Sequence, residues 1–563
     1  MVWVQRKEHT MTPIGPSIDE PASESTTPVW HRAVEAREMR ESGRALVRVA
    51  GHPVVLFRLP DGRTVALDNR CPHEGYPLYK GELRGEILHC CWHGFQFDLL
   101  TGRCIKGDES PRLFPVREVD GWLEVDVAEP GRALALAERQ ASLEQGLQHN
   151  RLGQVARDIA RLRRLGMASR DIAMFAARYD AEHAEFGSTH VLAVVADLWP
   201  LLDDTDGDLL RLMLPFEMAA EAHIRQPKRP IPRVLDPGED PVEAGAQLAA
   251  AVEAGDVETA EGILRAGLAK GWKRDVIEPW LYRVVADHFL DIGHALIYQV
   301  KVFDLLEVAG WEHAIDLLPA HLCRIVQGTR EDTLPEWHWF RARVATFLSV
   351  CSEAKSDASA ERDVQTSLVD VMVAGDRAAA FDAVEQAICS GVDAALVADA
   401  MALAAAQRVL DFDPATDLDV TVQDGWLDVT HAFTYAEALA QAVTRVQGHA
   451  RLRLVAFGIH YVSRLTAICP PYRRAEPTEA AHLDIAGLET RIFNDTRARP
   501  IVSAHYFKFV RSARAVFGRT LDPRPLNAAQ TLATADIALR RVPRLAHEAL
   551  RFVVDGKVPK RRT

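Results

Sequence analysis

The chain has 563 residues, a formal net charge of −13 and 48% hydrophobic residues. This length exceeds one ordinary hydrophobic core and indicates several domains. The acidic balance argues against nucleic acid and anionic membrane surfaces as partners, and the absence of any run of 18 apolar residues argues against a membrane span. The N-terminus lacks the apolar region of a secretory signal, so we expect a cytoplasmic protein.

Residues 30–128 have the pattern of short β-strands. Apolar and polar residues alternate over 44–49 and 53–58, and Pro60-Asp61-Gly62 is a hairpin signal before the next run at 64–68. Further short apolar runs continue to residue 127. Many short strands within a hundred residues predict a small antiparallel barrel or sandwich.

Two short loops of this β-region each carry one cysteine and one histidine. Cys71-Pro72-His73 is followed, after sixteen residues, by Cys90-Cys91-Trp92-His93-Gly94. A [2Fe–2S] cluster with mixed ligands needs two thiolates on one iron and two imidazoles on the other. We therefore predict a cluster held by Cys71, His73, Cys90 and His93, which moves single electrons. A zinc site is the alternative, although such sites usually pair Cys with Cys and His with His.

Beyond the ligands, the region resembles the Rieske family. The resemblance rests on Cys-Pro-His-Glu-Gly-Tyr-Pro-Leu, Cys-Cys-Trp-His-Gly-Phe-Gln-Phe-Asp, Thr101-Gly102 and the ending Leu113–Val116 with Asp120-Gly121. Cys91 stands where the resemblance leads us to expect proline. A second cysteine occurs only in the later loop, so the inter-loop disulfide of respiratory Rieske proteins cannot form. The domain therefore resembles the ferredoxin and oxygenase branch, with a lower potential.

After about residue 130 the pattern becomes helical. Ala, Leu, Glu and Arg dominate, and apolar residues recur at spacings of three to four. Clear examples of predicted helices are Val155–Leu165, Asp275–Phe289 and Ala378–Cys389. Expected loops are Gln226–Glu243, Ser352–Asp363 and Cys469–Pro477. The expected fold is a small antiparallel β Rieske domain followed by a large all-α domain.

The helical part shows signs of internal repetition. The segment from Ala254-Gly255-Asp256 to His294-Ala-Leu-Ile-Tyr is echoed from Ala374-Gly375-Asp376 to His431-Ala-Phe-Thr-Tyr. Such repeats imply helical hairpins that bury their apolar faces against one another. The expected division is a flexible segment 1–29, the Rieske domain 30–128, helical repeats 129–225, 246–351 and 364–468, and a C-terminal helical segment 478–563, with 129–563 as one domain in the alternative.

Histidines occupy matching places in these repeats, each expected to open an apolar helical stretch: His190, His294, His431 and His505. Imidazoles and carboxylates from several helices are how helical bundles hold iron. The sequence therefore predicts a catalytic role for these four residues and a second iron site, with additional ligands from the neighbouring His183, His288 and Asp291. The competing interpretation is structural, because a repeated histidine can simply be buried or cap a helix.

The function expected from these features is oxidation of a small organic molecule with O₂. No Asp/Glu-x-x-His-x₄₋₅-His run of the usual oxygenase iron domain occurs. The order His-Ala-Leu-Ile-Tyr, His-Ala-Phe-Thr-Tyr, His-Tyr-Phe-Lys resembles questin oxidase-like proteins, which implies a monooxygenase-type reaction on an aromatic type of substrate. No flavin or nicotinamide fingerprint occurs, so a separate reductase or ferredoxin is the expected electron donor. The alternative is a non-catalytic Rieske electron carrier or redox sensor with a helical docking scaffold.

Overall fold

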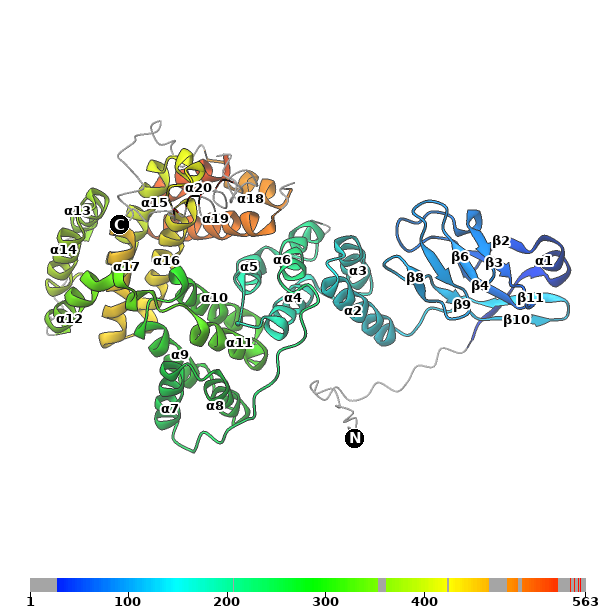
Figure 1. Cartoon of the computed structure of the whole chain (residues 1–563), viewed down its shortest axis with the longest axis horizontal. Helices are drawn as coiled ribbons and strands as arrows, with labels where there is room; N and C mark the ends of the chain where they lie inside the picture. Colours follow the sequence, from blue (N-terminus) through cyan, green and yellow to red (C-terminus); the bar gives the residue numbers. More distant parts are fainter. Residues whose placement is uncertain are drawn as a thin grey trace. The chain divides into compact units, whose positions relative to one another are not determined.

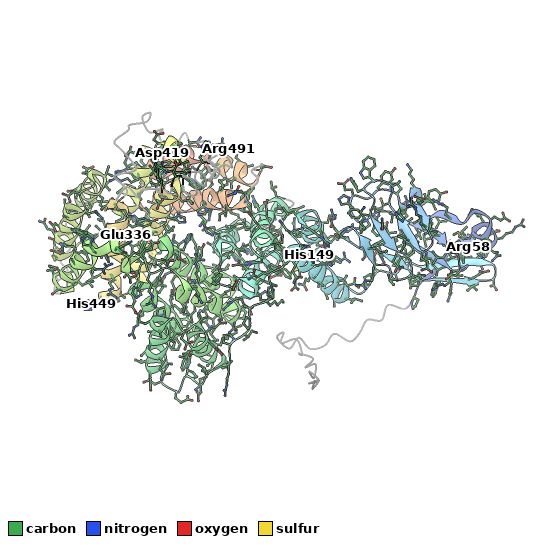
Figure 2. The ribbon with its side chains drawn as sticks, in the orientation of Figure 1. Arg58, His149, Glu336, Asp419, His449 and Arg491 are labelled. Carbon is green, nitrogen blue, oxygen red and sulfur yellow. The ribbon has the colours of Figure 1, made fainter. Side chains whose placement is uncertain are left out.

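The computed structural model describes residues 28–205, 207–352, 361–422, 425–464, 483–494, 499–534, 547, 551, 555 and 557. The chain forms two compact units (Figure 1). The β-rich unit comprises Met1–Gly146 and Gly153–Gly166, and the helical unit comprises Leu147–Leu152 and Met167–Thr563. In Figure 2, Arg58 marks the β-rich unit, and Glu336 and His449 mark the helical unit. Among the described residues, no helix has the length and apolarity needed to cross a membrane.

The β-rich unit contains three antiparallel sheets, with strand orders β1-β11-β10, β2-β3-β4-β9 and β5-β6-β7-β8. This confirms the predicted antiparallel β-domain. Its elements are β1 (Trp30–Glu35), α1 (Ala36–Ser42), β2 (Arg44–Val49), β3 (His52–Arg58), β4 (Thr64–Asp68), η1 (Leu78–Lys80), β5 (Glu82–Arg84), β6 (Ile87–His89), β7 (Gln96–Asp98), β8 (Cys104–Lys106), β9 (Leu113–Phe114), β10 (Val116–Val119) and β11 (Trp122–Asp126).

The β-rich unit has two apolar cores, and successive side chains of β3 point alternately into one core and the other. Val54 and Leu56 pack into one core, while Val55 and Phe57 pack into the other. Successive side chains of a strand point to opposite faces, so one fully buried strand serves both cores. The second core also contains Cys71 and Cys90 and thus anchors both predicted ligand loops.

Two helices complete the β-rich unit, α2 (Arg132–Gln148) in most of its length and α3 (Leu152–Arg164). The buried carboxylate of Glu109, in the loop after β8, accepts hydrogen bonds from Arg157 Nε at 3.1 Å and Arg161 Nη1 at 2.8 Å. These ion pairs fasten α3 to the β-domain. The compact unit therefore extends beyond the boundary at residue 128 that the sequence predicts.

The rest of the described chain is helical, which confirms the predicted second region. Its elements are α4 (Ser169–His183), α5 (His190–Leu198), η2 (Trp199–Leu201), α6 (Asp208–Ala222), α7 (Pro241–Ala254), α8 (Val257–Ala269), α9 (Arg274–Asp287), η3 (Asp291–Gly293), α10 (His294–Ala309), η4 (Trp311–His313), α11 (Ala314–Gln327), η5 (Glu331–Thr333), η6 (Pro335–Trp337), α12 (His338–Ser352), α13 (Glu361–Ala374), α14 (Arg377–Cys389), α15 (Ala394–Asp411), η7 (Pro414–Leu418), α16 (Trp426–Arg445), α17 (Gly448–Arg464), α18 (Ile485–Phe493), α19 (Pro500–Thr520) and α20 (Arg524–Thr534).

Matching local signals recur in the two segments that the sequence pairs as repeats. Gly255 and Gly375 follow α7 and α13 with φ of 73° and 87°, a conformation that glycine adopts without steric cost. The next residue in each case, Asp256 or Asp376, caps the following helix through its carboxylate. The repeat itself stays a prediction. Of the predicted segment 1–29, only the last two residues are described. The predicted loop Cys469–Pro477 lies wholly outside the described residues, and so do residues 353–360 of the predicted loop Ser352–Asp363.

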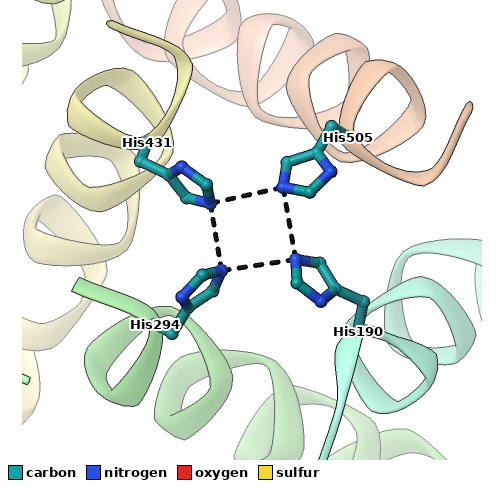
Figure 3. A group of neighbouring side chains, drawn as sticks. All are labelled: His190, His294, His431 and His505. Carbon is teal, nitrogen blue, oxygen red and sulfur yellow. Dashed lines mark hydrogen bonds between the residues drawn. The ribbon is translucent and has the colours of Figure 1, made fainter. Parts of the chain in front are cut away.

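Four helices of the helical unit pack in a closed ring. Helix α5 lies against α10, α10 against α16, α16 against α19, and α19 against α5. Such a ring points one stripe of each helix at a common interior. The four repeated histidines lie on these helices, one on each (Figure 3).

Candidate metal centres

The two ligand loops of the β-rich unit share one backbone conformation. The N–H of Cys71 donates to the carbonyl of Tyr76, and the N–H of Cys90 donates to the carbonyl of Phe95. In each loop the N–H of the glycine donates a hydrogen bond to the carbonyl of the cysteine: Gly75 to Cys71 and Gly94 to Cys90. The two glycines have φ of 75° and 68°. Only glycine adopts this conformation without strain, so both loops turn back tightly beside their cysteine.

In these loops the two thiols are buried and the two imidazoles are more accessible. Cys71 and Cys90 are 4% and 2% exposed, whereas His73 is half-buried and His93 is exposed. The two Nδ1 atoms are 3.1 Å apart, with the rings nearly perpendicular, and His73 stacks on Phe95. Bonds of about 2.0–2.1 Å to one metal place neighbouring nitrogens about 2.9–3.4 Å apart. The two Nδ1 atoms are therefore spaced as two ligands of one iron would be.

Backbone amides of the first loop also face the sulfur of Cys71. Burial raises the pKa of the Cys71 thiol to about 12, while the N–H groups of His73 and Glu74 act in the opposite direction by hydrogen bonding to the sulfur. Iron coordination would hold this group as thiolate. Amides near the sulfur favour the more negative, reduced cluster and thus tune its potential.

In the helical unit, four imidazoles meet around one point (Figure 3). His190 and His294 are the first residues of α5 and α10, as predicted, whereas His431 and His505 lie in the second turn of α16 and α19. Their Nε2 atoms form a four-sided ring with edges of 3.3, 3.0, 3.3 and 3.2 Å, joining in order His190, His294, His431 and His505. We call this set the four-histidine group.

Hydrogen bonds at the opposite ring nitrogens define the tautomers. Nδ1 of His294, His431 and His505 lies 2.7 Å from the backbone carbonyl oxygens of Asp291, Leu427 and Ile501, respectively. A carbonyl oxygen only accepts, so these Nδ1 atoms carry the proton and the Nε2 atoms carry lone pairs. Lone pairs thus face one another across two edges of the ring, His294–His431 at 3.0 Å and His431–His505 at 3.3 Å, with no proton between them while the imidazoles are neutral. That arrangement is repulsive unless a cation lies among them.

The electrostatic setting favours neutral imidazoles. Burial lowers the pKa of His190, His294 and His505 well below the usual range, and that of His431 to about 3. The charges of Lys508 and of neighbouring imidazoles act in the same direction. Neutral imidazole is the form that binds metal. The edges of the Nε2 ring also match ligands on one metal ion, about 2.9–3.4 Å apart.

The structure does not bring the remaining predicted ligands to this group. His183 ends α4, stacks on Tyr179 and contacts its carbonyl through Nδ1. His288 lies between Asp332 and Glu253, at 3.0 Å from each, which raises its pKa.

The side chain of Asp291 also points elsewhere. It pairs with Arg324 at 2.9 Å and accepts from the N–H of Thr329, so only its carbonyl reaches His294. Helix α9 ends at Asp287, and Asp291 and Ile292 have φ of 48° and 56°. Asp291 would lie one helical turn from both His288 and His294 only if one helix continued between them, and the structure has no such helix.

One residue beside the four-histidine group was not singled out from sequence. Lys508 lies one turn after His505 on α19, is 2% exposed, and its Nζ has no hydrogen-bond partner in the described part of the chain. Burial lowers its pKa to about 7. Its signal was the run His-Tyr-Phe-Lys, in which a lysine occupies the same helical face as the histidine.

Comparison with known proteins gives matches in the β-rich part. The family model of the Rieske [2Fe–2S] domain matches residues 29–119. The iron–sulfur subunit of the toluene-4-sulfonate monooxygenase system of Comamonas testosteroni is 32% identical over 112 residues, 18% of this chain and 32% of that protein. The anthranilate 1,2-dioxygenase ferredoxin subunit of Burkholderia cepacia is 33% identical over 108 residues, 19% of this chain and 98% of that protein.

Among solved structures, dicamba monooxygenase bound to dicamba matches with 29% identity and a TM-score of 0.17, covering 18% of this chain and 33% of that one. The chain thus spans about a third or less of the length of the oxygenase components that it matches first.

Proposed function

We propose a function from the premise that this chain belongs to the Rieske [2Fe–2S] family through residues 29–119 and carries the cluster of that family. The predicted resemblance is thereby confirmed, and the oxygenase-type relatives support an oxygenase-like role. In our proposal the chain is an O₂-dependent oxidoreductase. Its cluster, held by Cys71, His73, Cys90 and His93, passes electrons to an iron ion held by the four-histidine group.

The observation that carries this proposal is the set of lone pairs within the four-histidine group. Two of its edges, His294–His431 at 3.0 Å and His431–His505 at 3.3 Å, join nitrogens that cannot donate to each other while neutral. The Nε2 atom of the buried His321 instead faces a complementary partner, the side-chain oxygen of Gln299 at 2.7 Å. Imidazole ligands suit iron, and iron when bound would supply the capacity to activate O₂.

The residues of the chain would have separate tasks in this reaction. The carbonyls of Asp291, Leu427 and Ile501 fix the ring orientations and keep Nε2 free of protons. Packing of α5, α10, α16 and α19 buries His294, His431 and His505, whereas His190 is half-buried. At the cluster, His93 and the 58% exposed Trp92 lie at the surface, where a reductase or ferredoxin would deliver electrons.

The substrate class follows from similarity and stays part of the proposal. Relatives are named for toluene-4-sulfonate, 3-chlorobenzoate and anthranilate, which are all aromatic. The resemblance of the histidine segments to questin oxidase-like proteins also favours an aromatic type of substrate and a monooxygenase-type reaction. We therefore propose a small aromatic molecule and O₂ as the substrates.

A second function is supported by one specific observation. The match to the anthranilate 1,2-dioxygenase ferredoxin subunit covers 98% of that protein, so a domain of this kind also exists as a separate electron carrier. In that alternative the cluster exchanges electrons with other proteins, and the helical unit is a docking scaffold without a metal.

Iron analysis with reoxidation kinetics separates the two functions. The wild-type chain should hold three iron atoms, and the double variant His294→Ala/His431→Ala should hold two with an unchanged cluster EPR signal. Reoxidation of the reduced cluster by O₂ should then be slower in the double variant. His460→Ala is the matched control, since His460 is equally buried but lies outside the group. Two irons in the wild type, with reoxidation unaffected by the variants, would favour the carrier.

A further inference from the structure

A buried lysine whose amine has no hydrogen-bond partner among the described residues lies beside the four-histidine group. Lys508 follows His505 by one helical turn, and side chains in a helix lean toward its N-terminus, so the lysine extends along the face that carries His505. Its positive charge lowers the pKa of all four imidazoles, which agrees with an ammonium close to the group. Yet its Nζ has no hydrogen-bond partner among the described residues.

The carboxylates that influence Lys508 and its surroundings already have cations. Oδ1 of Asp197 accepts from Lys301 at 2.6 Å, whereas its Oδ2 has no hydrogen-bond partner among the described residues and forms no ion pair with Lys508; both side chains of the Asp197–Lys301 pair are buried. Glu437 accepts from Gln441 at 2.8 Å and lies 3.7 Å from Arg519. A buried ammonium with no anion is unfavourable, which is why burial lowers the pKa of Lys508 to about 7. The described residues place no acceptor within hydrogen-bond distance of Nζ, so an added anion would favour the charged amine and complete this site.

Two further buried donors flank the group. Tyr298 follows His294 by one turn, and its ring centroid lies 5.3 Å from that of His294 and 5.8 Å from that of His190. The indole of Trp426 lies 5.8 Å from His505. The Tyr298 hydroxyl and the Trp426 Nε1 have no partner in the described structure, and both side chains are at most 1% exposed. Three different donors around one group thus lack acceptors.

The absence of charge on the four imidazole ligands also favours binding of an anion. Four neutral imidazoles leave the charge of a divalent ion uncompensated, because the group contains no carboxylate. In a buried site such a charge needs a counter-ion. An anion at the metal would accept from Lys508 and balance both charges.

We propose that the four-histidine group binds a small anionic ligand, whose charge is balanced by Lys508 and which accepts further hydrogen bonds from Tyr298 and Trp426. The ligand is an inorganic anion or the carboxylate or phenolate of an organic substrate. This inference rests on the proposed function, since the anion would bind at the metal. Lys508 is in this view a positioning residue for the ligand.

The test measures anion binding to the full-length, iron-loaded chain by isothermal titration calorimetry, with azide as the small inorganic probe and benzoate as the organic one. Lys508→Met removes the charge at similar length, and Lys508→Arg keeps it. We expect the Kd of the bound probe to rise about 10- to 100-fold in Lys508→Met, the loss of one charge-assisted hydrogen bond. Lys508→Arg should retain most of the affinity. Binding of azide alone supports an inorganic anion, and competition by benzoate supports an anionic substrate.

Iron content, measured on every sample, separates the possible failures. Three irons per chain with no binding of either probe, or with equal affinity in wild type and Lys508→Met, would overturn this inference and leave the proposed function intact. Two irons per chain in the wild type would overturn both. If Lys508→Met fails to fold, the wild-type titration and Lys508→Arg still decide, because wild-type protein that binds neither azide nor benzoate contradicts the inference.

Discussion

Replacement of His431 by leucine should change stability in opposite directions with and without metal. In the metal-free chain, His431 Nε2 faces the bare nitrogens of His294 and His505 at 3.0 and 3.3 Å. A buried acceptor without a donor costs about 1–3 kcal/mol. Leucine removes that acceptor and the repulsion, so the metal-free His431→Leu variant should be more stable than the metal-free wild type by about that amount.

With metal the order should reverse. A ligand that binds only the folded state stabilises it by about 2.7 kcal/mol at 100 times its Kd. The wild type gains this free energy, whereas the variant, having lost one of four ligands, gains much less. The difference between the two proteins should therefore change sign when metal is added.

The assay is urea unfolding followed by far-UV circular dichroism, in EDTA and in excess ferrous iron under anaerobic conditions. His460→Leu is the matched control, because His460 is 2% exposed and packs on Trp337 away from the group. Its effect on the free energy of unfolding should be the same in both conditions. Equal effects of His431→Leu with and without iron would refute the metal-centre reasoning.

Three other predictions concern the cluster, a pH effect and the attachment of α3. Cys71→Ser/Cys90→Ser should lose two of three irons and the Rieske EPR signal, while iron at the four-histidine group remains; loss of all three would contradict separate sites. The pKa of His288 is raised by Asp332 and then Glu253, so its protonated form stabilises the fold below the unfolded pKa of about 6.5, and that stabilisation is lost as pH rises through the raised value. His288→Gln should thus destabilise the chain at pH 6 and have little effect at pH 9, as measured by urea unfolding; an equal effect at both values would contradict this. Glu109→Gln removes the buried anion of Arg157 and leaves Arg161 with Asp158 alone, so it should lower the free energy of unfolding of the β-rich unit by about 1–3 kcal/mol, whereas an unchanged urea midpoint would show that α3 is not held by this contact.

Part of this structure is readable from local sequence. The Pro60–Gly62 turn predicts the β3–β4 hairpin correctly. The alternation predicted over 53–58 does not hold, because β3 buries four consecutive apolar residues between two cores. The three-residue strands β5 and β8 were not singled out, since so short a run carries no periodic signal. The link of α3 to the β-domain depends on ion pairs to Glu109, a tertiary contact that spacing does not reveal.

The candidate site shows the same division. The predicted repeat pairs His190, His294, His431 and His505 with one another, and the structure brings their Nε2 atoms together. The predicted helix end at Phe289 and helix start at His294 leave room for a break, but its geometry has no local sequence signal, because Asp291 and Ile292 adopt positive φ, which is rare for a β-branched residue. Lys508 was missed because lysine is rarely buried, so its type argued for a solvent-exposed position.

The most direct test of the four-histidine metal centre is an anomalous difference map from crystals of the anaerobically purified chain, recorded at the iron edge. We predict anomalous iron density beside the cluster ligands and a second peak about 2.0–2.1 Å from the Nε2 atoms of His190, His294, His431 and His505. Iron density at the cluster alone, with the four imidazoles hydrogen-bonded to one another or to water, would contradict it.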